Sequence, residues 1–337
     1  MKQLLMIAPF LLMSGLGTDI ADAADSPATY TYNCKTDAEI PQAQRDAINK
    51  VAMDFVTASQ SSHPETAFAM LTSAVQETTS ADKLAAEFAS HIDQSDPYKN
   101  LKVDHSYLIS TTGGGSEVRA ICGSVHGRDS VSVQIKTGLT QAHVLISGQT
   151  RNNSSAFTLW LLPEGNLWRV QVFHVGDSAM VGRSAGDLLE LARKQRDAGH
   201  AFNATMLYIG AASLSDWGPV FQPDIAQTID EESKGLVLPI EFQQTPPMTW
   251  KMNGIEFKVD KVEILGVDGK IGLAFDLPLA AWTGDEDADK RNHAFLDAFI
   301  ASHPDYSSAF GFLVAKAQKP DGSGGFASVY EVGKGYD

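Results

Sequence analysis

The sequence predicts an α+β protein, because helical and strand-like segments fall into separate blocks instead of alternating. Apolar residues recur at helical spacing from residue 42 to about residue 92, and short β-rich runs follow one another from residue 101. Two further helical segments follow residue 184, and strands surround one helix beyond residue 249. The 337 residues, 43% hydrophobic and 20% charged, are enough for two folded domains.

The first 23 residues are typical of a secretory signal peptide. Lys2 precedes an apolar stretch at 4–16, and the Ala-Asp-Ala sequence at 21–23 offers the small residues that a signal peptidase needs. A membrane anchor, the alternative, requires about 20 apolar residues, whereas this run is shorter and contains Pro9. We therefore expect a mature chain that starts at Ala24, has no integral membrane segment and is periplasmic or secreted.

The chain is strongly acidic, with a formal net charge of −15. Loss of the first 23 residues, which hold one lysine and two aspartates, would leave −14. A surface of this sign repels phosphate backbones and anionic lipid headgroups. The composition therefore disfavours nucleic acids and membrane surfaces as partners.

The chain has two cysteines, Cys34 and Cys122. In an exported chain they could form one disulfide that closes a loop of nearly ninety residues. Two unpaired buried thiols are the alternative. Cys34 lies in the segment 24–41, which is rich in Ala, Ser, Pro and Thr and lacks periodicity, so we expect this segment to be a leader.

Residues 42–180 are predicted to form helices followed by an antiparallel sheet. Three apolar stripes indicate the helices, and Thr79 and Ser80 are the N-cap candidates of the third. The stripes consist of Ile48, Val51 and Phe55, then Phe68, Leu71 and Val75, then Leu84, Phe88 and Ile92. The segment 156–175 reads as a β-hairpin, because two apolar runs flank the Pro-Glu-Gly-Asn turn at 163–166.

Four features of this region occur in a known family: the first helix around 48–56, the short helix at 67–71, the segment 80–88 and a late strand at 168–170. The Trp-Arg-Val sequence of that strand is similar to a Gly-x-Trp-[Arg/Lys]-Val pattern, although two residues separate Gly165 from the tryptophan. Residues 42–180 thus resemble the nuclear-transport-factor-2-like, or ketosteroid-isomerase-like, family. The resemblance implies a cone-like sheet around a pocket that relatives use for catalysis, ligand binding or protein contacts.

Residues 181–221 are predicted to form a helical hairpin, broken at 198–200 by Ala-Gly-His. The segment 222–248 holds four prolines and is expected to be a linker. Residues 249–337 predict a small α+β domain with the order β-β-β-α-β-β, in which the helix runs from about 287 to 301. We recognise no family for this domain.

The Gly-Arg-Ser-Ala-Gly sequence at 182–186 matches the Gly-x-Ser-x-Gly motif of serine hydrolases and contains Ser184. In those enzymes the serine lies directly on the turn after a strand of a parallel sheet, whereas eight residues separate Val175 from Ser184 here. Asp187 follows three residues later, a spacing that instead indicates a helix capping box. We prefer the capping interpretation.

The remaining polar motifs do not predict a metal or cofactor site. The acidic run at 285–289 begins like a calcium loop but lacks the glycine and glutamate that such a loop needs. His293 and His303 are about 15 Å apart along one helix, too far to share a metal ion.

Strand alternation places Trp168 and His174 on one face of the hairpin. Together with Trp160 they are our candidates for a ligand-binding pocket, although aromatic residues on strands are more often core. No acidic base with matching hydrogen-bond donors can be assigned to this pocket. We expect an exported non-catalytic protein that binds a small apolar ligand or a protein partner; the alternative is a serine hydrolase that uses Ser184.

Overall fold

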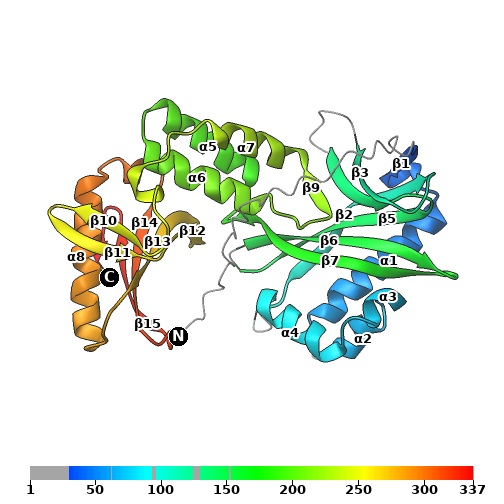
Figure 1. The fold of residues 1–337 in the computed structure, drawn as a ribbon, viewed down its shortest axis with the longest axis horizontal. Helices are drawn as coiled ribbons and strands as arrows, with labels where there is room; N and C mark the ends of the chain where they lie inside the picture. The colour runs from blue at the N-terminus through cyan, green and yellow to red at the C-terminus, as the bar shows by residue number, and fades with distance from the viewer. Residues whose placement is uncertain (1–29, 62, 93–95, 124–129, 152, 337) are drawn as a thin grey trace, which may run out of the picture. The chain divides into compact units, whose positions relative to one another are not determined.

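The computed structural model describes residues 30–61, 63–92, 96–123, 130–151 and 153–336 (Figure 1). It shows an α+β protein made of two compact units. The first unit contains Met1–Ser147, Phe157–Val175 and Pro219–Phe221, and the second contains Gly148–Ala156, Gly176–Gly218 and Gln222–Asp337. The predicted signal peptide lies outside the described residues.

The helices of the first unit follow the predicted apolar stripes. They are α1 (Gln42–Ser59), α2 (Pro64–Phe68), α3 (Ser73–Gln76) and α4 (Ala81–His91). Helix α1 buries Ile48, Ala52 and Phe55 against the sheet. Ser80 caps α4, as predicted, by accepting a hydrogen bond from the Lys83 backbone N–H at 3.3 Å.

The main sheet is antiparallel where its registers are defined and has the order β1-β2-β5-β6-β7-β8 (Figure 1). Its strands are β1 (Tyr32–Thr36), β2 (Lys99–Thr111), β5 (Thr140–Gln149), β6 (Asn153–Glu164), β7 (Leu167–Met180) and β8 (Arg183–Ser184). Strands β6 and β7 are the predicted hairpin, and Gly165 takes a φ of 61° in its turn.

A smaller sheet of order β3-β4-β9 covers the face of the main sheet opposite the helices (Figure 1). It contains β3 (Glu117–Cys122), β4 (Val131–Lys136) and β9 (Phe221–Pro223). Along β5, Val144 and Ile146 pack in the helix-side cluster, whereas the Gln141 side chain bonds to the backbone of Lys136 on β4. The first unit therefore has three layers.

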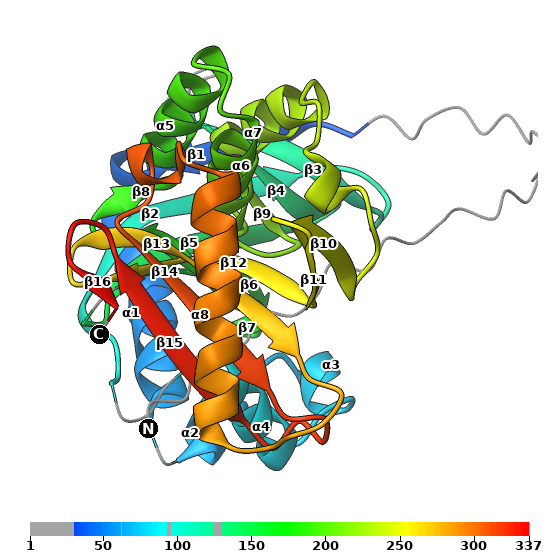
Figure 2. The same ribbon diagram turned by 90° about the vertical axis from the view of Figure 1, so that its left-hand side faces the viewer.

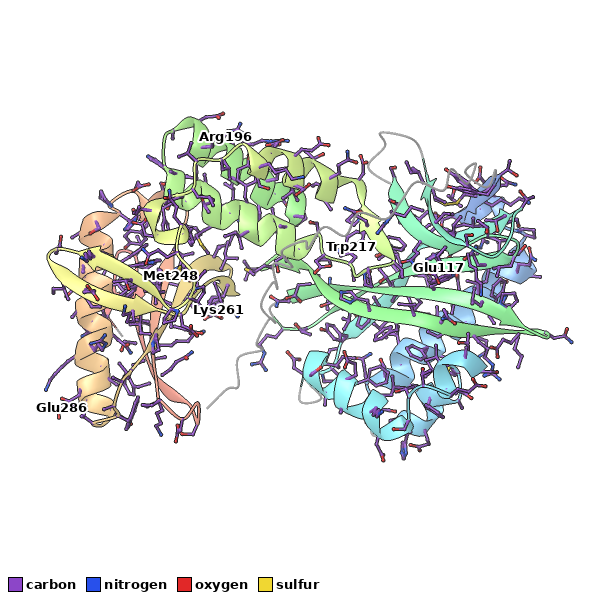
Figure 3. The ribbon with its side chains drawn as sticks, viewed as in Figure 1. Glu117, Arg196, Trp217, Met248, Lys261 and Glu286 are labelled. Atoms are coloured by element: carbon purple, nitrogen blue, oxygen red, sulfur yellow. A yellow bond between two sulfur atoms is a disulfide. The ribbon has the colours of Figure 1, made fainter. Side chains whose placement is uncertain are left out.

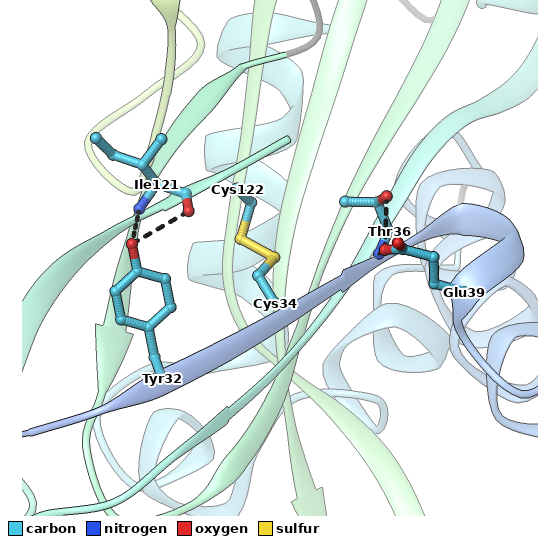
Figure 4. The surroundings of a disulfide bond; sticks show 6 residues. All are labelled: Tyr32, Cys34, Thr36, Glu39, Ile121 and Cys122. Atoms are coloured by element: carbon cyan, nitrogen blue, oxygen red, sulfur yellow. Dashed lines mark hydrogen bonds between the residues drawn. A yellow bond between two sulfur atoms is a disulfide. The ribbon is translucent and has the colours of Figure 1, made fainter. Parts of the chain in front are cut away.

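Cys34 and Cys122 form a disulfide that joins β1 to β3 (Figure 4). Beside it, the Tyr32 hydroxyl donates to the Ile121 carbonyl at 3.3 Å and accepts from the Ile121 N–H at 3.2 Å. The segment 24–41 is thus more than the expected leader, because its end forms β1 and pairs with β2. This edge strand is held by backbone hydrogen bonds and the disulfide. Neither leaves a periodic pattern of apolar residues in the sequence, so the strand was not predicted.

In the second unit, α5 (Ala185–Asp197) and α6 (Ala201–Leu214) form the predicted helical hairpin. A third helix, α7 (Asp224–Lys234), packs beside them within the segment expected to be a linker. Ile225 and Ile229 give α7 an apolar stripe, and its prolines lie outside the helix. The Arg196 guanidinium (Figure 3) donates to the Tyr208 hydroxyl, which donates to Glu232, so one chain of bonds links the three helices.

The C-terminal part of the second unit has one more strand before its helix, and one more after it, than predicted. The strands are β10 (Met248–Met252), β11 (Ile255–Val259), β12 (Lys261–Val267), β13 (Lys270–Pro278), β14 (Phe312–Gln318), β15 (Gly325–Glu331) and β16 (Gly335–Tyr336). Helix α8 (Asp285–Ser302) connects β13 to its parallel neighbour β14 and lies across the five-stranded sheet (Figure 2).

The core of the second unit is aromatic. The Trp250 ring lies 5.9 Å from Phe275, 6.4 Å from Phe299 and 6.1 Å from Phe202. Two short 3-10 helices, η2 (Ile240–Phe242) and η3 (Tyr306–Ser308), border this core. Phe202 lies in the first turn of α6 and Phe299 in the last turn of α8, so this packing brings the ends of the two helices together.

Candidate functional site

Aromatic rings fill the helix side of the main sheet, where a cone-like fold would have its pocket. The Phe55 ring lies 6.0 Å from Phe88 and 5.2 Å from Phe173, and Tyr98 meets Phe157 edge-on at 4.8 Å. Phe55, Phe88 and Phe157 are all buried. These positions form a packed core in the first unit.

The structure places Trp160 and Trp168 on opposite faces of the main sheet. Trp160 is 3% exposed, donates from Nε1 to the Gln141 Oε1 at 2.9 Å and lies on the side of the smaller sheet. Trp168 packs in the helix-side cluster. Phe173, which strand alternation would put opposite Trp168, packs in the same cluster, so the alternation is interrupted between them. His174 is half-buried, six residues or about 20 Å along β7 from Trp168.

Ser184 caps α5. Its hydroxyl donates to Asp187 Oδ2 at 2.7 Å and accepts from the Asp187 N–H at 3.3 Å, and the Ser184 N–H donates to the same carboxylate at 2.8 Å. These bonds lower the pKa of Asp187. No histidine in the described part of the chain is hydrogen-bonded to Ser184, whose hydroxyl instead donates to the carboxylate that caps α5.

A cavity of about 350 Å³ in the second unit brings two histidines and two carboxylates together. We call it the histidine pocket. It is lined by Gly199, His200, Ala201, Phe202, Pro239, Glu241, His303 and Asp305. The lining comes from the α5–α6 turn, η2 and the segment after α8. Gly199 makes the turn possible with a φ of 80°, a conformation that favours glycine.

Two backbone carbonyls determine which ring nitrogen of neutral His200 carries the proton. Asn203 Nδ2 donates to the Asp305 carbonyl at 2.9 Å, and Gln195 Nε2 donates to the Ser308 carbonyl at 3.4 Å. Because carbonyls only accept, Gln195 must present its Oε1 to the other side, where His200 Nδ1 lies at 2.8 Å. His200 Nδ1 therefore carries a proton, and in the neutral ring Nε2 keeps a free lone pair.

After His200 Nε2, the Asp305 carboxylate is the second hydrogen-bond acceptor of the pocket that receives no hydrogen bond from the described residues. Its Oδ2 lies 4.0 Å from His200 Nδ1, which is beyond hydrogen-bonding distance, and its side chain is 29% exposed. Within the described residues, the bonds of Asp305 use its backbone and not its carboxylate.

Glu241 and His303 form an ion pair on the other side of the pocket. His303 Nε2 lies 3.4 Å from Glu241 Oε1, and His303 Nδ1 lies 3.3 Å from the Phe299 carbonyl. The bond from His303 lowers the pKa of Glu241. The His303 ring also stacks on Phe299 with centroids 4.5 Å apart.

A second cavity, of about 460 Å³, shares Glu241 with the histidine pocket. The segment 235–247 contributes Pro239 to the first cavity and Ile240 to the second, and we call this segment the strap. Val237 and Ile240 on the strap are 86% and 68% exposed. The ion pair with His303 ties the strap to the end of α8.

The sequence did not single out the histidine pocket. His200 appeared only as part of a helix break, and His303 was considered only together with His293 on the same helix. The fold instead brings His303 close to residues a hundred positions earlier. A histidine at each of two helix ends is the signal that could have suggested the pocket, but it is a weak one.

Comparisons with protein-family models, curated proteins and solved structures gave no match for this chain. Among the described residues, no group of three or more His, Cys, Asp or Glu side chains is placed to hold a metal ion. None of the helices in the described part is long and apolar enough to cross a membrane.

Proposed function

We propose that the protein is exported and binds a small ligand, without catalysing a reaction, in the histidine pocket. The observation that carries the proposal is the lining of this cavity, which combines unused hydrogen-bond acceptors with the Phe202 ring. Its volume of about 350 Å³ lies in the range of small-molecule sites. The signal-like residues 1–23 and the disulfide support export.

The first unit has a supporting role in this proposal. Its helices and curved sheet resemble the nuclear-transport-factor-2-like family, whose members use the fold for ligand binding or for protein contacts. Phe55, Phe88 and Phe157 are packed into the core on the helix side of the sheet, so we assign contact with a protein partner to this unit. We therefore assign small-ligand binding to the second unit.

The test is an NMR titration of the mature protein, labelled with ¹³C at histidine, against a small library of aromatic fragments. We expect saturable shifts of the His200 and His303 ring signals. Ala201→Phe should fill the pocket and abolish these shifts, because Ala201 lies in its lining. Ala212→Phe is the matched control, since Ala212 is exposed on the same helix about 16 Å away.

Two results would contradict the proposal. One is the absence of any saturable shift across the library. The other is equal binding to both phenylalanine variants, which would place the ligand elsewhere.

A further inference from the structure

We infer that the ligand of the histidine pocket is a small organic cation, an amine with an apolar body, held by the Asp305 carboxylate and His200 Nε2. This inference rests on the proposed function and specifies its ligand class. The ligand class follows from which hydrogen-bonding groups of the lining already have a partner in the protein and which do not.

Two side-chain groups of the lining are unused acceptors, and the backbone N–H of Phe202, in the first turn of α6, is a donor without an acceptor among the described residues. Within the part of the chain that the structure describes, Asp305 Oδ2 has no donor at hydrogen-bonding distance, and the bond from Nδ1 to Gln195 leaves His200 Nε2 with a lone pair in the neutral ring. The backbone N–H groups of Gly199, His200 and Ala201 already donate to carbonyls of the turn. A ligand that donates hydrogen bonds therefore fits this side of the pocket, and an ammonium group donates up to three.

The charges of the pocket favour a cation. Glu241 is paired with His303, whereas the Asp305 carboxylate has no cationic partner in hydrogen-bonding contact among the described residues. The chain as a whole carries −15, so the long-range field has the same sign.

The N-terminus of α6 opposes this preference, because Ala201 and Phe202 begin the helix and belong to the lining. A helix N-terminus attracts anions with the equivalent of about half an elementary charge. The full charge of Asp305 outweighs this half charge, so the pocket retains a net preference for cations.

The apolar part of the ligand would lie against Phe202. This ring belongs to the lining and sits 4.8 Å from the His303 ring, and Ala201 and Pro239 supply further apolar surface. An ammonium group near the face of an aromatic ring gains an additional electrostatic attraction. The pocket thus offers an aromatic side for the body and a carboxylate side for the amine.

The test compares benzylamine, benzyl alcohol and benzoate, which share one ring and differ in charge. Each is titrated into the mature protein at pH 7.5 while the His200 and His303 ring signals are followed. We expect benzylamine to bind at least tenfold more tightly than benzyl alcohol, and benzoate to bind most weakly.

Asp305→Asn should remove the tenfold preference, because the amide keeps the shape of the side chain and loses its charge. Its backbone carbonyl, which orders Asn203, is unchanged. Asp46→Asn, at an exposed position on α1, changes the net charge by the same amount and should leave the preference intact. His200→Gln should weaken benzylamine binding as a second, independent variant. Thermal unfolding of each variant verifies that it is folded.

The outcomes separate the ligand class from the pocket. Tighter binding of benzoate or benzyl alcohol at the same histidines would overturn the cation inference and leave the proposed function standing. An unchanged benzylamine preference in Asp305→Asn would also overturn the inference. If none of the three compounds binds and the fragment library is silent as well, both proposals fail.

Discussion

The ring of His143 stacks on the indole of Trp160, with centroids 5.7 Å apart and planes inclined by 13°. Both residues are buried between the main sheet and the smaller sheet of the first unit. Burial lowers the pKa of His143 to about 3, and the opposing effect of the Gln134 backbone is smaller. His143 is therefore a neutral ring that the fold protects from protonation.

Acidification should destabilise the protein through His143. The unfolded chain takes up this proton near pH 6.5 and the folded chain only near pH 3, so the unfolded state binds more protons between these values. The free energy of unfolding therefore falls as the pH drops through this window, by about 2–3 kcal/mol at pH 4.5. Urea unfolding at pH 7.5 and 4.5 measures the loss.

The comparison that isolates His143 uses two variants. His143→Leu should reduce the acid sensitivity, because leucine does not titrate. His63→Gln should leave it unchanged, since His63 is largely exposed and contacts only an exposed glutamate. Equal pH dependence in wild type and His143→Leu would refute the explanation.

Loss of the Cys34–Cys122 bond should destabilise the first unit. The bond joins residues 88 positions apart, and the chain-entropy model gives about 4–5 kcal/mol as the upper limit for such a loop. Denaturant unfolding of the Cys34→Ser/Cys122→Ser double variant measures the effect. The intact mass of the exported protein should be two hydrogens below that of the dithiol form. Free thiols that react with an alkylating agent before reduction would contradict the bond.

Ser184→Ala should lower stability by about 1 kcal/mol, the usual cost of losing an N-cap. The reason is the reciprocal pair of bonds between Ser184 and Asp187. We also expect no labelling of the wild-type protein by a fluorophosphonate probe, since the described part of the chain places no histidine base on this hydroxyl. Labelling that disappears in Ser184→Ala would revive the serine hydrolase alternative.

Gln195→Met should both destabilise the second unit and change the protonation of His200. The substitution removes an acceptor that Asn203, Ser308 and His200 share, and His200 Nδ1 is left unpaired because the other two donors keep the Asp305 carbonyl. An unpaired polar group that is partly buried costs about 1–3 kcal/mol. In ¹⁵N-labelled protein, the ring nitrogens of His200 should report a mixture of tautomers where the wild type has its proton on Nδ1. A single Nδ1–H tautomer in the variant would show that Gln195 does not position this ring.

The strap should be the first site of limited proteolysis. Val237 and Ile240 are exposed on it, whereas Ile229 anchors the preceding helix α7 in the core. Glu241→Gln should accelerate cleavage because it removes the charge that pairs with His303. Glu256→Gln, an exposed change beside the second cavity, is the control. First cleavage within α7, or equal rates for the two variants, would be inconsistent with this role of the ion pair.

Elements with a strong local pattern were predicted from the sequence, and elements that depend on distant partners were not. The stripe of Ile48 and Phe55 and the turn at Gly165 each report local geometry, so α1 and the β6–β7 hairpin were expected. Strand β1 was missed because its neighbours on β2 lie more than seventy residues away. Helix α7 was missed because the prolines around it outweighed the short stripe of Ile225 and Ile229.

The site was harder to predict than the fold, for a related reason. Trp160 and Trp168 were chosen because aromatic residues on a strand often line a pocket. In the structure both side chains pack in the core layers on either side of the main sheet. The distinctive property of His200 is the proton on Nδ1, which depends on two backbone carbonyls about a hundred residues further along the chain. No local pattern in the sequence carries that information.

Neither unit of this protein is one continuous segment of the chain. The chain crosses between the units at 147/148, 156/157, 175/176, 218/219 and 221/222. Three of these crossings lie inside strands β5, β6 and β7. A truncation at any one position would therefore remove part of at least one unit, so neither unit can be produced alone by shortening the chain from one end.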